Sequence, residues 1–162
     1  ASGGSASAAQ AMQVVEGWFR ERLAKAGVRL ATEDAGLQFP LQPQALEQVM
    51  SNLVGNALDA LVGRTDGRIE LRTRISDGRR CLEVADNGPG IDAALRERIL
   101  QPFFSTKPLG QGLGLGLSIV GDLVEASGGR LEVLDRAGGG ALVRASWPVG
   151  REGARITKEN RA

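Results

Sequence analysis

The chain alternates between stretches with apolar residues at helical spacing and stretches in which apolar and polar residues take turns. Apolar side chains recur every three or four residues over 12–26 and 43–62, which predicts two amphipathic helices. Alternation over 68–76, followed by the apolar-rich stretch 79–85, predicts a β-hairpin, because the Asp-Gly dipeptide between these stretches is a two-residue turn signal. These elements predict a sheet with helices packed against it.

The same kinds of pattern predict the remaining elements. They predict a strand over 28–32, a helix from Asp92 to about Leu100, a helix that opens in 112–118 and ends at Gly128, and a last hairpin of strands 130–135 and 141–148. The order is not a repeating βαβ chain. It predicts an α+β two-layer sandwich, in which a mixed, mostly antiparallel sheet has helices on one face.

Composition limits the possible classes of protein. The 162 residues, 42% of them hydrophobic, suit one domain, and the net charge of +1 favours neither a nucleic-acid nor a membrane partner. We assign 1–9 to a linker or cloning remnant, 10–149 to the domain and 150–162 to a mobile tail. The single cysteine, Cys81, excludes an internal disulfide, and we expect it in the core, with Trp18 and Trp147 also in packing roles. Histidine is absent.

The predicted helix over 43–62 carries a polar stripe besides its apolar face. Asn52, Asn56 and Asp59 stand at i, i+4 and i+7, so they share one side of the helix. A solvated face explains such a stripe, but asparagine is a poor residue for a helix interior, and no lysine, arginine or glutamate joins it between 49 and 62. The alternative is a ligand site in which the amide oxygen of Asn56 binds Mg²⁺, a cation that prefers oxygen ligands.

ADNGPG (85–90) follows the second strand of the predicted hairpin and has two interpretations. It is ideal turn chemistry. It also suits a ligand site, because Gly88 and Gly90 let the backbone approach a flat ligand and Asp86 can accept a hydrogen bond from an exocyclic amine. GPGIDA (88–93) matches a dinucleotide fingerprint, but the preceding hairpin excludes the βαβ unit that this fingerprint needs, and no P-loop pattern occurs.

Residues 102–118 combine adjacent phenylalanines, a lysine and alternating glycine and leucine. Phe103 and Phe104 are either core residues or the anchor of a lid, with Lys107 close to a phosphate. In GLGLGLS (112–118), glycines at the start of a helix leave its N–H donors uncovered, and the positive end of the helix dipole favours a phosphate. Close helix packing is the alternative explanation.

In this order, the motifs resemble the ATP-binding domain of sensor histidine kinases, of the superfamily that includes gyrase B, the ninety-kilodalton heat-shock chaperones and mismatch-repair ATPases. NLVGNALDA (52–60) is similar to the N box, DNGPG (86–90) to the G1 box, PFFSTK (102–107) to the F box, GQGLGLGLS (110–118) to the G2 box and GGGA (138–141) to a final glycine box. The resemblance covers about 12–149, and the motif sequences are most similar to those of kinases of the nitrogen-regulation and C4-dicarboxylate-sensor type.

The resemblance implies a Bergerat-type fold that binds ATP and Mg²⁺ between the N-box helix and a mobile lid. It implies catalytic roles for Asn56 as the Mg²⁺ ligand, for Asn52 as support for the triphosphate, and for Lys107 at the terminal phosphate. It assigns the adenine amine to Asp86. The residues that it places around the nucleotide are Asn52, Asn56, Asp59, Asp86, Gly88, Gly90, Phe104, Thr106, Lys107, Gly112, Leu113, Gly114, Leu115 and Gly116.

One position separates the branches of the superfamily, and two departures from the kinase pattern matter. Asn52 stands where hydrolysing relatives carry a glutamate general base, and an amide cannot take a proton from water, which favours phosphoryl transfer to a histidine over hydrolysis. Ala141 stands where many relatives have threonine, so a hydroxyl contact to phosphate is lost. Because the sequence contains no histidine, the phospho-accepting side chain must lie elsewhere.

The resemblance therefore implies the catalytic domain of a two-component sensor histidine kinase, excised from its parent and monomeric by itself. Its expected partners are the dimerisation and phospho-acceptor helical hairpin of that parent, which Trp18 could face, and the receiver domain of a response regulator. We expect a cytoplasmic location, with a parent that can be anchored in the inner membrane. The alternatives are an ATPase switch of the same superfamily, a serine kinase of the anti-sigma-factor kind, and a degenerate nucleotide-binding module.

Overall fold

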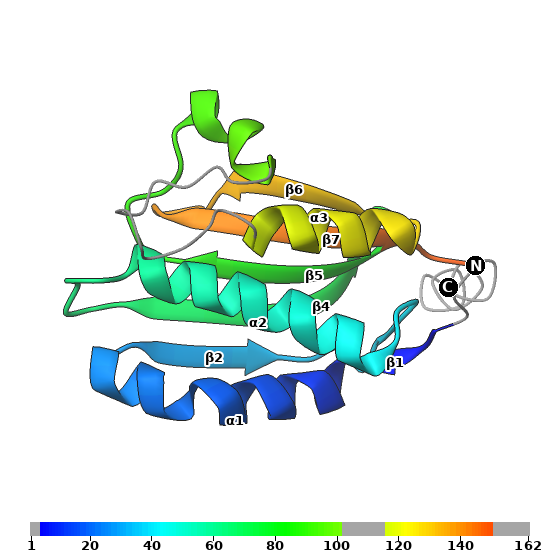
Figure 1. Ribbon diagram of the computed structural model, residues 1–162, viewed down its shortest axis with the longest axis horizontal. Helices are drawn as coiled ribbons and strands as arrows, with labels where there is room; N and C mark the ends of the chain where they lie inside the picture. The colour runs from blue at the N-terminus through cyan, green and yellow to red at the C-terminus, as the bar shows by residue number, and fades with distance from the viewer. Residues whose placement is uncertain (1–3, 102–115, 151–162) are drawn as a thin grey trace, which may run out of the picture.

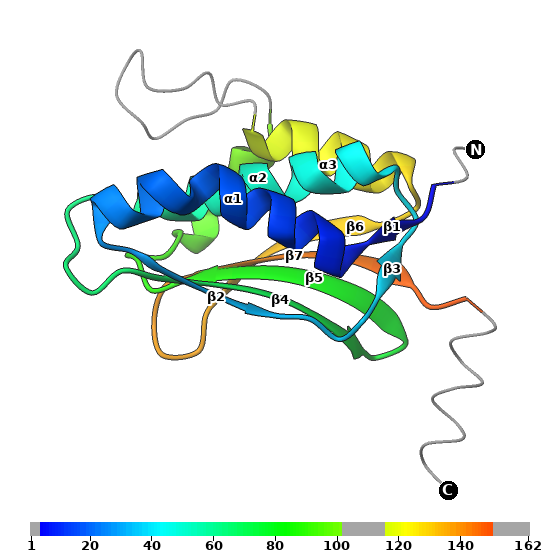
Figure 2. The ribbon, with the colours of Figure 1, turned by 90° about the horizontal axis from the view of Figure 1, so that it is seen from below.

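The computed structural model of the protein describes residues 4–101 and 116–150, in which helices lie on one side of a five-stranded sheet (Figures 1 and 2). The helices are α1 (Ala8–Ala26), α2 (Pro43–Ala60) and α3 (Gly116–Ala126). Gly27 ends α1 in a left-handed conformation with φ +66°, and Pro43 occupies the first turn of α2, where its missing N–H costs no hydrogen bond.

The sheet has the order β2-β4-β5-β7-β6. Only the β2–β4 pair is parallel among its strand pairs, and the other three pairs are antiparallel. The expected two-layer sandwich with a mixed, mostly antiparallel sheet is confirmed. The strands are β2 (Arg29–Glu33), β4 (Arg68–Ser76), β5 (Arg79–Asp86), β6 (Arg130–Asp135) and β7 (Ala141–Pro148).

The predicted hairpin of β4 and β5 is also confirmed. Asp77 and Gly78 have φ values of +52° and +70°, as a turn with two left-handed central residues requires. Alternate residues of β4, such as Ile69 and Leu71, are fully buried under the helices, which fixes the register.

The expectation of a linker over 1–9 is wrong from Ala6 onward. Ala6–Ser7 form strand β1, which pairs with β3 (Gln38–Phe39), and neither strand was expected. The Ser7 hydroxyl caps α1 by accepting a hydrogen bond from the amide of Gln10 at 3.3 Å. Ala6 and Ala8 are buried, so the small residues that gave the segment the composition of a linker are instead the ones that fit beneath α1.

The helix expected from Asp92 to about Leu100 is replaced by two 3-10 turns, η1 (Ala93–Leu95) and η2 (Arg98–Leu100). The capping residue was identified correctly, because the Asp92 carboxylate accepts a hydrogen bond from the amide of Ala94 at 3.1 Å. Neither turn contains a buried residue, so the segment lacks the packed apolar face from which short helices draw their stability.

The core lies between the helices and the sheet. Trp147 is 2% exposed and meets Phe39 edge-on, with ring centroids 5.2 Å apart, as expected for a packing residue. Cys81 on β5 is also buried, as expected, but its register partner is Arg74, so it lies on the side of the sheet away from the helices. Burial raises the pKa of the Cys81 thiol. Trp18 was expected to pack, but its side chain stands on α1 with 58% of its surface exposed, so that expectation is wrong.

The side of the sheet turned away from the helices is called the open face here. Strand alternation and register place twelve charged residues on it, of which eight are arginines and four are glutamates, and no lysine is among them. The residues are Arg29, Glu33, Arg68, Glu70, Arg72, Arg74, Arg79, Glu83, Arg130, Glu132, Arg136 and Arg144.

Candidate functional site

The asparagine stripe of α2 faces the first turn of α3. Asn52, Asn56 and Asp59 are all half-buried on α2. A Cβ placed on Gly116, the first residue of α3, would lie 3.5 Å from both the Nδ2 and the Oδ1 atoms of Asn56. The structure therefore brings the Asn56 amide against the N-terminal turn of α3, as the two motifs require.

Asp59 lies at the end of this stripe and also faces α1. Its Oδ1 atom is 3.9 Å from the Nη2 atom of Arg22, in an ion pair whose side chains are 38% and 57% exposed. An exposed pair at that distance contributes little to stability. The ion pair places the Asp59 carboxylate near α1, so a role of Asp59 at the nucleotide stays a prediction.

Asp86 ends β5 on the helix-covered side of the sheet and is 7% exposed. Burial raises the pKa of this carboxyl, although the backbone N–H groups of Gly88 and Ala141 and the charges of Arg136 and Arg64 act in the opposite direction. The amide of Gly88 donates to its Oδ1 atom at 2.9 Å. A desolvated carboxylate held by backbone groups keeps acceptor capacity for a further donor.

Glycines surround Asp86 because side chains would not fit. Gly140 has φ +103°, and a Cβ there would lie only 1.9 Å from the carbonyl oxygen of Asp86. A Cβ on Gly88 would lie 2.9 Å from the Asp86 carboxylate and 3.1 Å from the carbonyl oxygen of Ala60 in α2. Gly90, with φ +78°, needs its left-handed conformation. The G1 and final glycine boxes thus hold one carboxylate from two sides.

Asn87 is a positioning residue that the sequence analysis did not single out. Its side-chain oxygen accepts a hydrogen bond from the amide of Arg68 at 2.7 Å, and its Nδ2 donates to the carbonyl of Asp66 at 2.8 Å. These bonds tie the loop after Asp86 to the start of β4. An asparagine in a turn is expected to bond its own loop, so only the tertiary structure reveals this longer-range tie.

Part of the predicted set falls outside the residues that the structure describes, namely Phe104, Thr106, Lys107, Gly112, Leu113, Gly114 and Leu115. Within 4–101 and 116–150, the structure forms two halves of a site. Asn56 with Gly116 is one half, and Asp86 with Gly88 and Gly140 is the other. Both halves lie at the same end of α2, because Asn56 is one turn from the Ala60 carbonyl that meets Gly88.

Comparison with known proteins places this arrangement in a family. Residues 41–151, well over half of the chain, match the family described as Histidine kinase-, DNA gyrase B-, and HSP90-like ATPase. The C4-dicarboxylate transport sensor protein DctB of Rhizobium meliloti (strain 1021) is 44% identical over 106 residues, which are 65% of this chain and 17% of that protein. The signal transduction histidine-protein kinase AtoS of Escherichia coli (strain K12) is 37% identical over 111 residues, 68% of this chain and 18% of that protein.

The fold agrees with these sequence relatives. The nucleotide-free catalytic domain of histidine kinase ThkA superposes with a TM-score of 0.77 and 28% identity, over 89% of this chain and 93% of that one. ThkA in complex with the response regulator TrrA gives a TM-score of 0.72 at 26% identity, over 91% of this chain and 42% of that one. Among the described residues, no helix combines the length and apolarity needed to cross a bilayer.

The matched part spans less than a fifth of the length of DctB and of AtoS, so it corresponds to one domain of such proteins. The family match, the order of the N and G1 boxes on α2 and β5, and the superposition on ThkA agree with one another. The chain belongs to the Histidine kinase-, DNA gyrase B-, and HSP90-like ATPase family, and within it has the catalytic-domain fold of sensor histidine kinases.

Proposed function

We propose that the chain is the catalytic domain of a two-component sensor kinase, which binds Mg²⁺ and ATP for transfer of the terminal phosphoryl group to a histidine. The observation that carries the proposal is the contact between the two boxes, where Asn56 of α2 meets Gly116, the first residue of α3. A Cβ at Gly116 would occupy the space next to the Asn56 amide, and a helix N-terminus that a glycine leaves uncovered suits a phosphate.

The residues present fit the nucleotide and the metal ion. Asn56 offers a neutral oxygen to Mg²⁺, which usually keeps several waters and needs few protein ligands. Asp86 offers a carboxylate oxygen to the adenine amine at the end of α2 where Gly88 and Gly140 clear the backbone. Bound ATP would supply the phosphoryl group, with Asn52 and Asn56 orienting its phosphates and Lys107 neutralising part of their charge.

The accepting imidazole must come from sequence outside these 162 residues or from another protein, because this sequence contains no histidine. We assign it to a helical hairpin of the parent kinase, and the phosphoryl group passes on to a receiver domain. A complex of kinase and response regulator is described for ThkA with TrrA. We further propose that the domain is cytoplasmic and monomeric and binds no nucleic acid.

Calorimetric titration with a non-hydrolysable ATP analogue, with and without Mg²⁺, tests the proposal. Asn56→Ala and Asp86→Ala should each weaken binding by about 1–3 kcal/mol, as for a lost hydrogen bond to a charged or buried group. Only Asn56→Ala should also abolish the gain in affinity that Mg²⁺ provides, because only Asn56 is assigned to the metal.

Gln48→Ala is the matched control, since it removes an exposed amide from the same helix without touching the site. Binding by this variant should equal that of the unmodified protein. Equal affinity in all the variants would refute the site assignment. Sustained hydrolysis of ATP by the chain alone would favour an ATPase switch over the kinase.

A further inference from the structure

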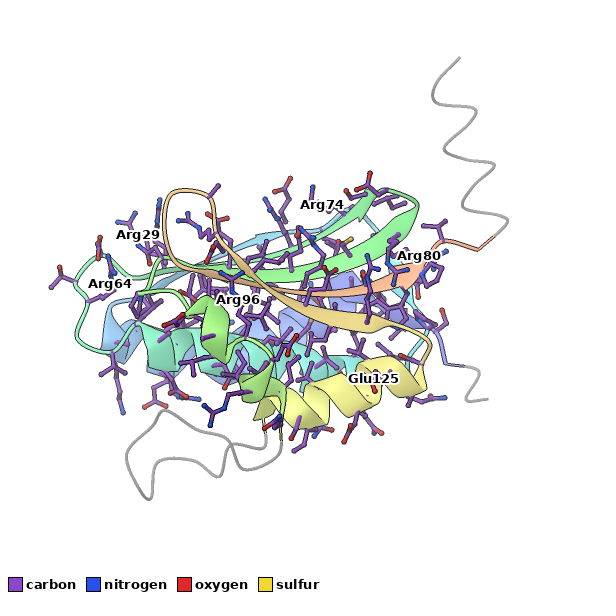
Figure 3. The ribbon with its side chains drawn as sticks, turned by 90° about the horizontal axis from the view of Figure 1, so that it is seen from above. Arg29, Arg64, Arg74, Arg80, Arg96 and Glu125 are labelled. Atoms are coloured by element: carbon purple, nitrogen blue, oxygen red, sulfur yellow. The ribbon has the colours of Figure 1, made fainter. Side chains whose placement is uncertain are left out.

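Charge is segregated between the open face of the sheet and the remainder of the molecule. The open face carries eight arginines and four glutamates, a net charge of +4, whereas the chain as a whole has +1. The other described residues include seven basic and thirteen acidic side chains, a net charge of −6. In Figure 3, Arg29 and Arg74 lie on the sheet side of the molecule and Glu125 lies on α3.

The carboxylates of the open face leave much of this positive charge uncompensated. Glu83 alone is shared by Arg72, Arg74 and Arg144, and Glu70 is paired with Arg136 at 3.4 Å. Each guanidinium has five N–H donors, more than one shared carboxylate can accept. Donors of these arginines therefore remain available to an incoming anion.

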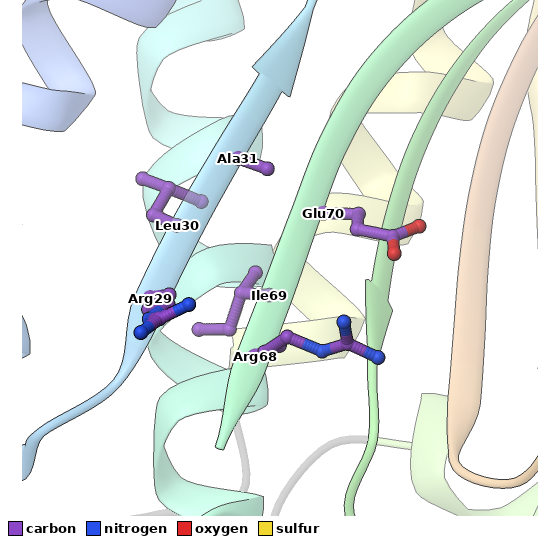
Figure 4. Close-up of a pocket in the computed structure, with 6 residues that line it drawn as sticks. All are labelled: Arg29, Leu30, Ala31, Arg68, Ile69 and Glu70. Carbon is purple, nitrogen blue, oxygen red and sulfur yellow. The ribbon is translucent and has the colours of Figure 1, made fainter. Parts of the chain in front are cut away.

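Arg29 and Arg68 are the arginines of the open face whose charge is least compensated. They are direct register partners on the parallel strands β2 and β4, which run about 4.8 Å apart, and like charges on directly opposite residues repel. Within 4–101 and 116–150 neither guanidinium takes part in a hydrogen bond or ion pair, and the nearby Asp66 is paired with Arg64 at 3.2 Å. Both arginines line a shallow groove of about 460 Å³ together with Glu70 (Figure 4).

The composition of the face favours an anion that offers paired oxygen acceptors. Arginine binds carboxylates and phosphates with two parallel hydrogen bonds, whereas lysine, which is absent from the face, is a point charge that would serve equally for a diffuse anionic surface. The open face carries no aromatic side chain for stacking on bases or insertion into a bilayer. An acidic protein surface is therefore the partner that this face fits best.

We propose that the open face is a docking surface for an acidic protein partner, with Arg29 and Arg68 as its principal contacts. Five strands of five to nine residues, spaced about 4.8 Å apart and rising about 3.3 Å per residue, give an area of about 600 Å². That area is below the ~800 Å² per partner of a stable complex and is typical of transient signalling contacts. Docking is thus weak, rapid and sensitive to salt, and it does not depend on the nucleotide site.

A titration of the isotope-labelled chain with a 20-residue oligoglutamate peptide, followed by amide NMR shifts, tests the proposal. Shifts should concentrate in β2 and β4 and vanish at high salt. The Arg29→Glu/Arg68→Glu double variant should bind the peptide about fivefold more weakly. Arg20→Glu is the matched control, because it reverses the charge of one exposed arginine on α1, and it should leave binding unchanged.

Parallel titrations with phosphatidylglycerol vesicles and with a 20-base-pair DNA duplex separate the other anionic partners. The proposal is overturned if either of these binds the open face more tightly than the peptide does, or if Arg20→Glu weakens peptide binding as much as the double variant. It is also overturned if the labelled chain self-associates through β2 and β4. Arg29→Gln/Arg68→Gln repeats the test without added negative charge, in case the glutamate variant fails to fold.

Discussion

Two buried carboxylates on one strand have opposite environments. Glu83 and Asp86 are three residues apart on β5, so strand alternation turns Glu83 to the open face and Asp86 to the helix-covered side. Glu83, fully buried, accepts hydrogen bonds from Arg72 at 3.0 Å, Arg74 at 2.7 Å and Arg144 at 2.8 Å. Asp86 receives instead backbone N–H groups and lies against glycines.

The pKa values of the two groups move in opposite directions. Burial by itself would raise the pKa of Glu83, but the hydrogen bonds and charges of Arg74 and Arg144 outweigh it, and the pKa is lowered. At Asp86 burial dominates and the pKa is raised. This difference distinguishes a structural carboxylate from a ligand-binding one. A carboxylate saturated by guanidinium groups holds strands together, whereas a carboxylate held by backbone groups can still accept a hydrogen bond from a ligand.

Breaking the arginine cluster should have the largest effect on stability. Glu83→Gln removes the one carboxylate shared by three arginines and leaves their mutual repulsion, so unfolding free energy should fall by about 3 kcal/mol. Urea unfolding measures this loss. Glu132→Gln, which breaks the pair with Arg130 at 3.4 Å, is the control and should cost less than about 1 kcal/mol. Equal losses of unfolding free energy in the two variants would contradict a structural role for Glu83.

A smaller effect should follow from crowding Asp86. Gly140→Ala would place a Cβ 1.9 Å from the Asp86 carbonyl oxygen at a backbone φ of +103°, so we expect a loss of about 2–3 kcal/mol together with weaker nucleotide binding. Gly139→Ala has a similar φ of +107° but no atom within 4 Å of the added carbon. It should share the backbone strain without the loss of nucleotide binding. Thermal unfolding and calorimetry separate these two contributions.

The two carboxylates also show how far the sequence could be interpreted. Asp86 was proposed as a site residue from its motif, and β4, β5, β6 and β7 lie almost as predicted, because alternation and turn residues are local signals. Glu83 was not identified. Its partners Arg72, Arg74 and Arg144 come from two other strands, and nothing local to Glu83 reveals that their register brings them together.

The failures at the ends of elements have the same origin. Strand β1 forms only because β3 is there to pair with it, and the two-residue strands are too short for any period to be recognised. The segment 93–100 carries helix-forming residues and a cap at Asp92, yet its side chains are at most partly buried against neighbouring elements. Local signals were misleading in both places, because tertiary contacts decided the outcome.

The pH dependence of the unfolding free energy is the test of Glu83 against Asp86 with the smallest expected effect. Because the folded state lowers the pKa of Glu83, the stabilisation that Glu83 provides is present above the ordinary carboxyl pKa and is lost as pH falls through the lowered value. Because the folded state raises the pKa of Asp86, its ionisation opposes folding, and stability attributable to Asp86 falls as pH rises from the ordinary value through the raised one.

Asp86→Asn keeps an oxygen acceptor for Gly88 and removes the buried charge, so it should be at least as stable as the unmodified protein at neutral pH. Its stability should then drop more steeply on acidification, because protonation of Asp86 no longer offsets the loss at Glu83. Nucleotide affinity of the unmodified protein should fall in acid at a pH above that of an ordinary carboxyl, since only ionised Asp86 accepts fully from the adenine amine. Urea unfolding from pH 2 to 8 and calorimetry from pH 4 to 8 measure the two trends, and identical pH profiles of stability for the two proteins would contradict the desolvated state of Asp86.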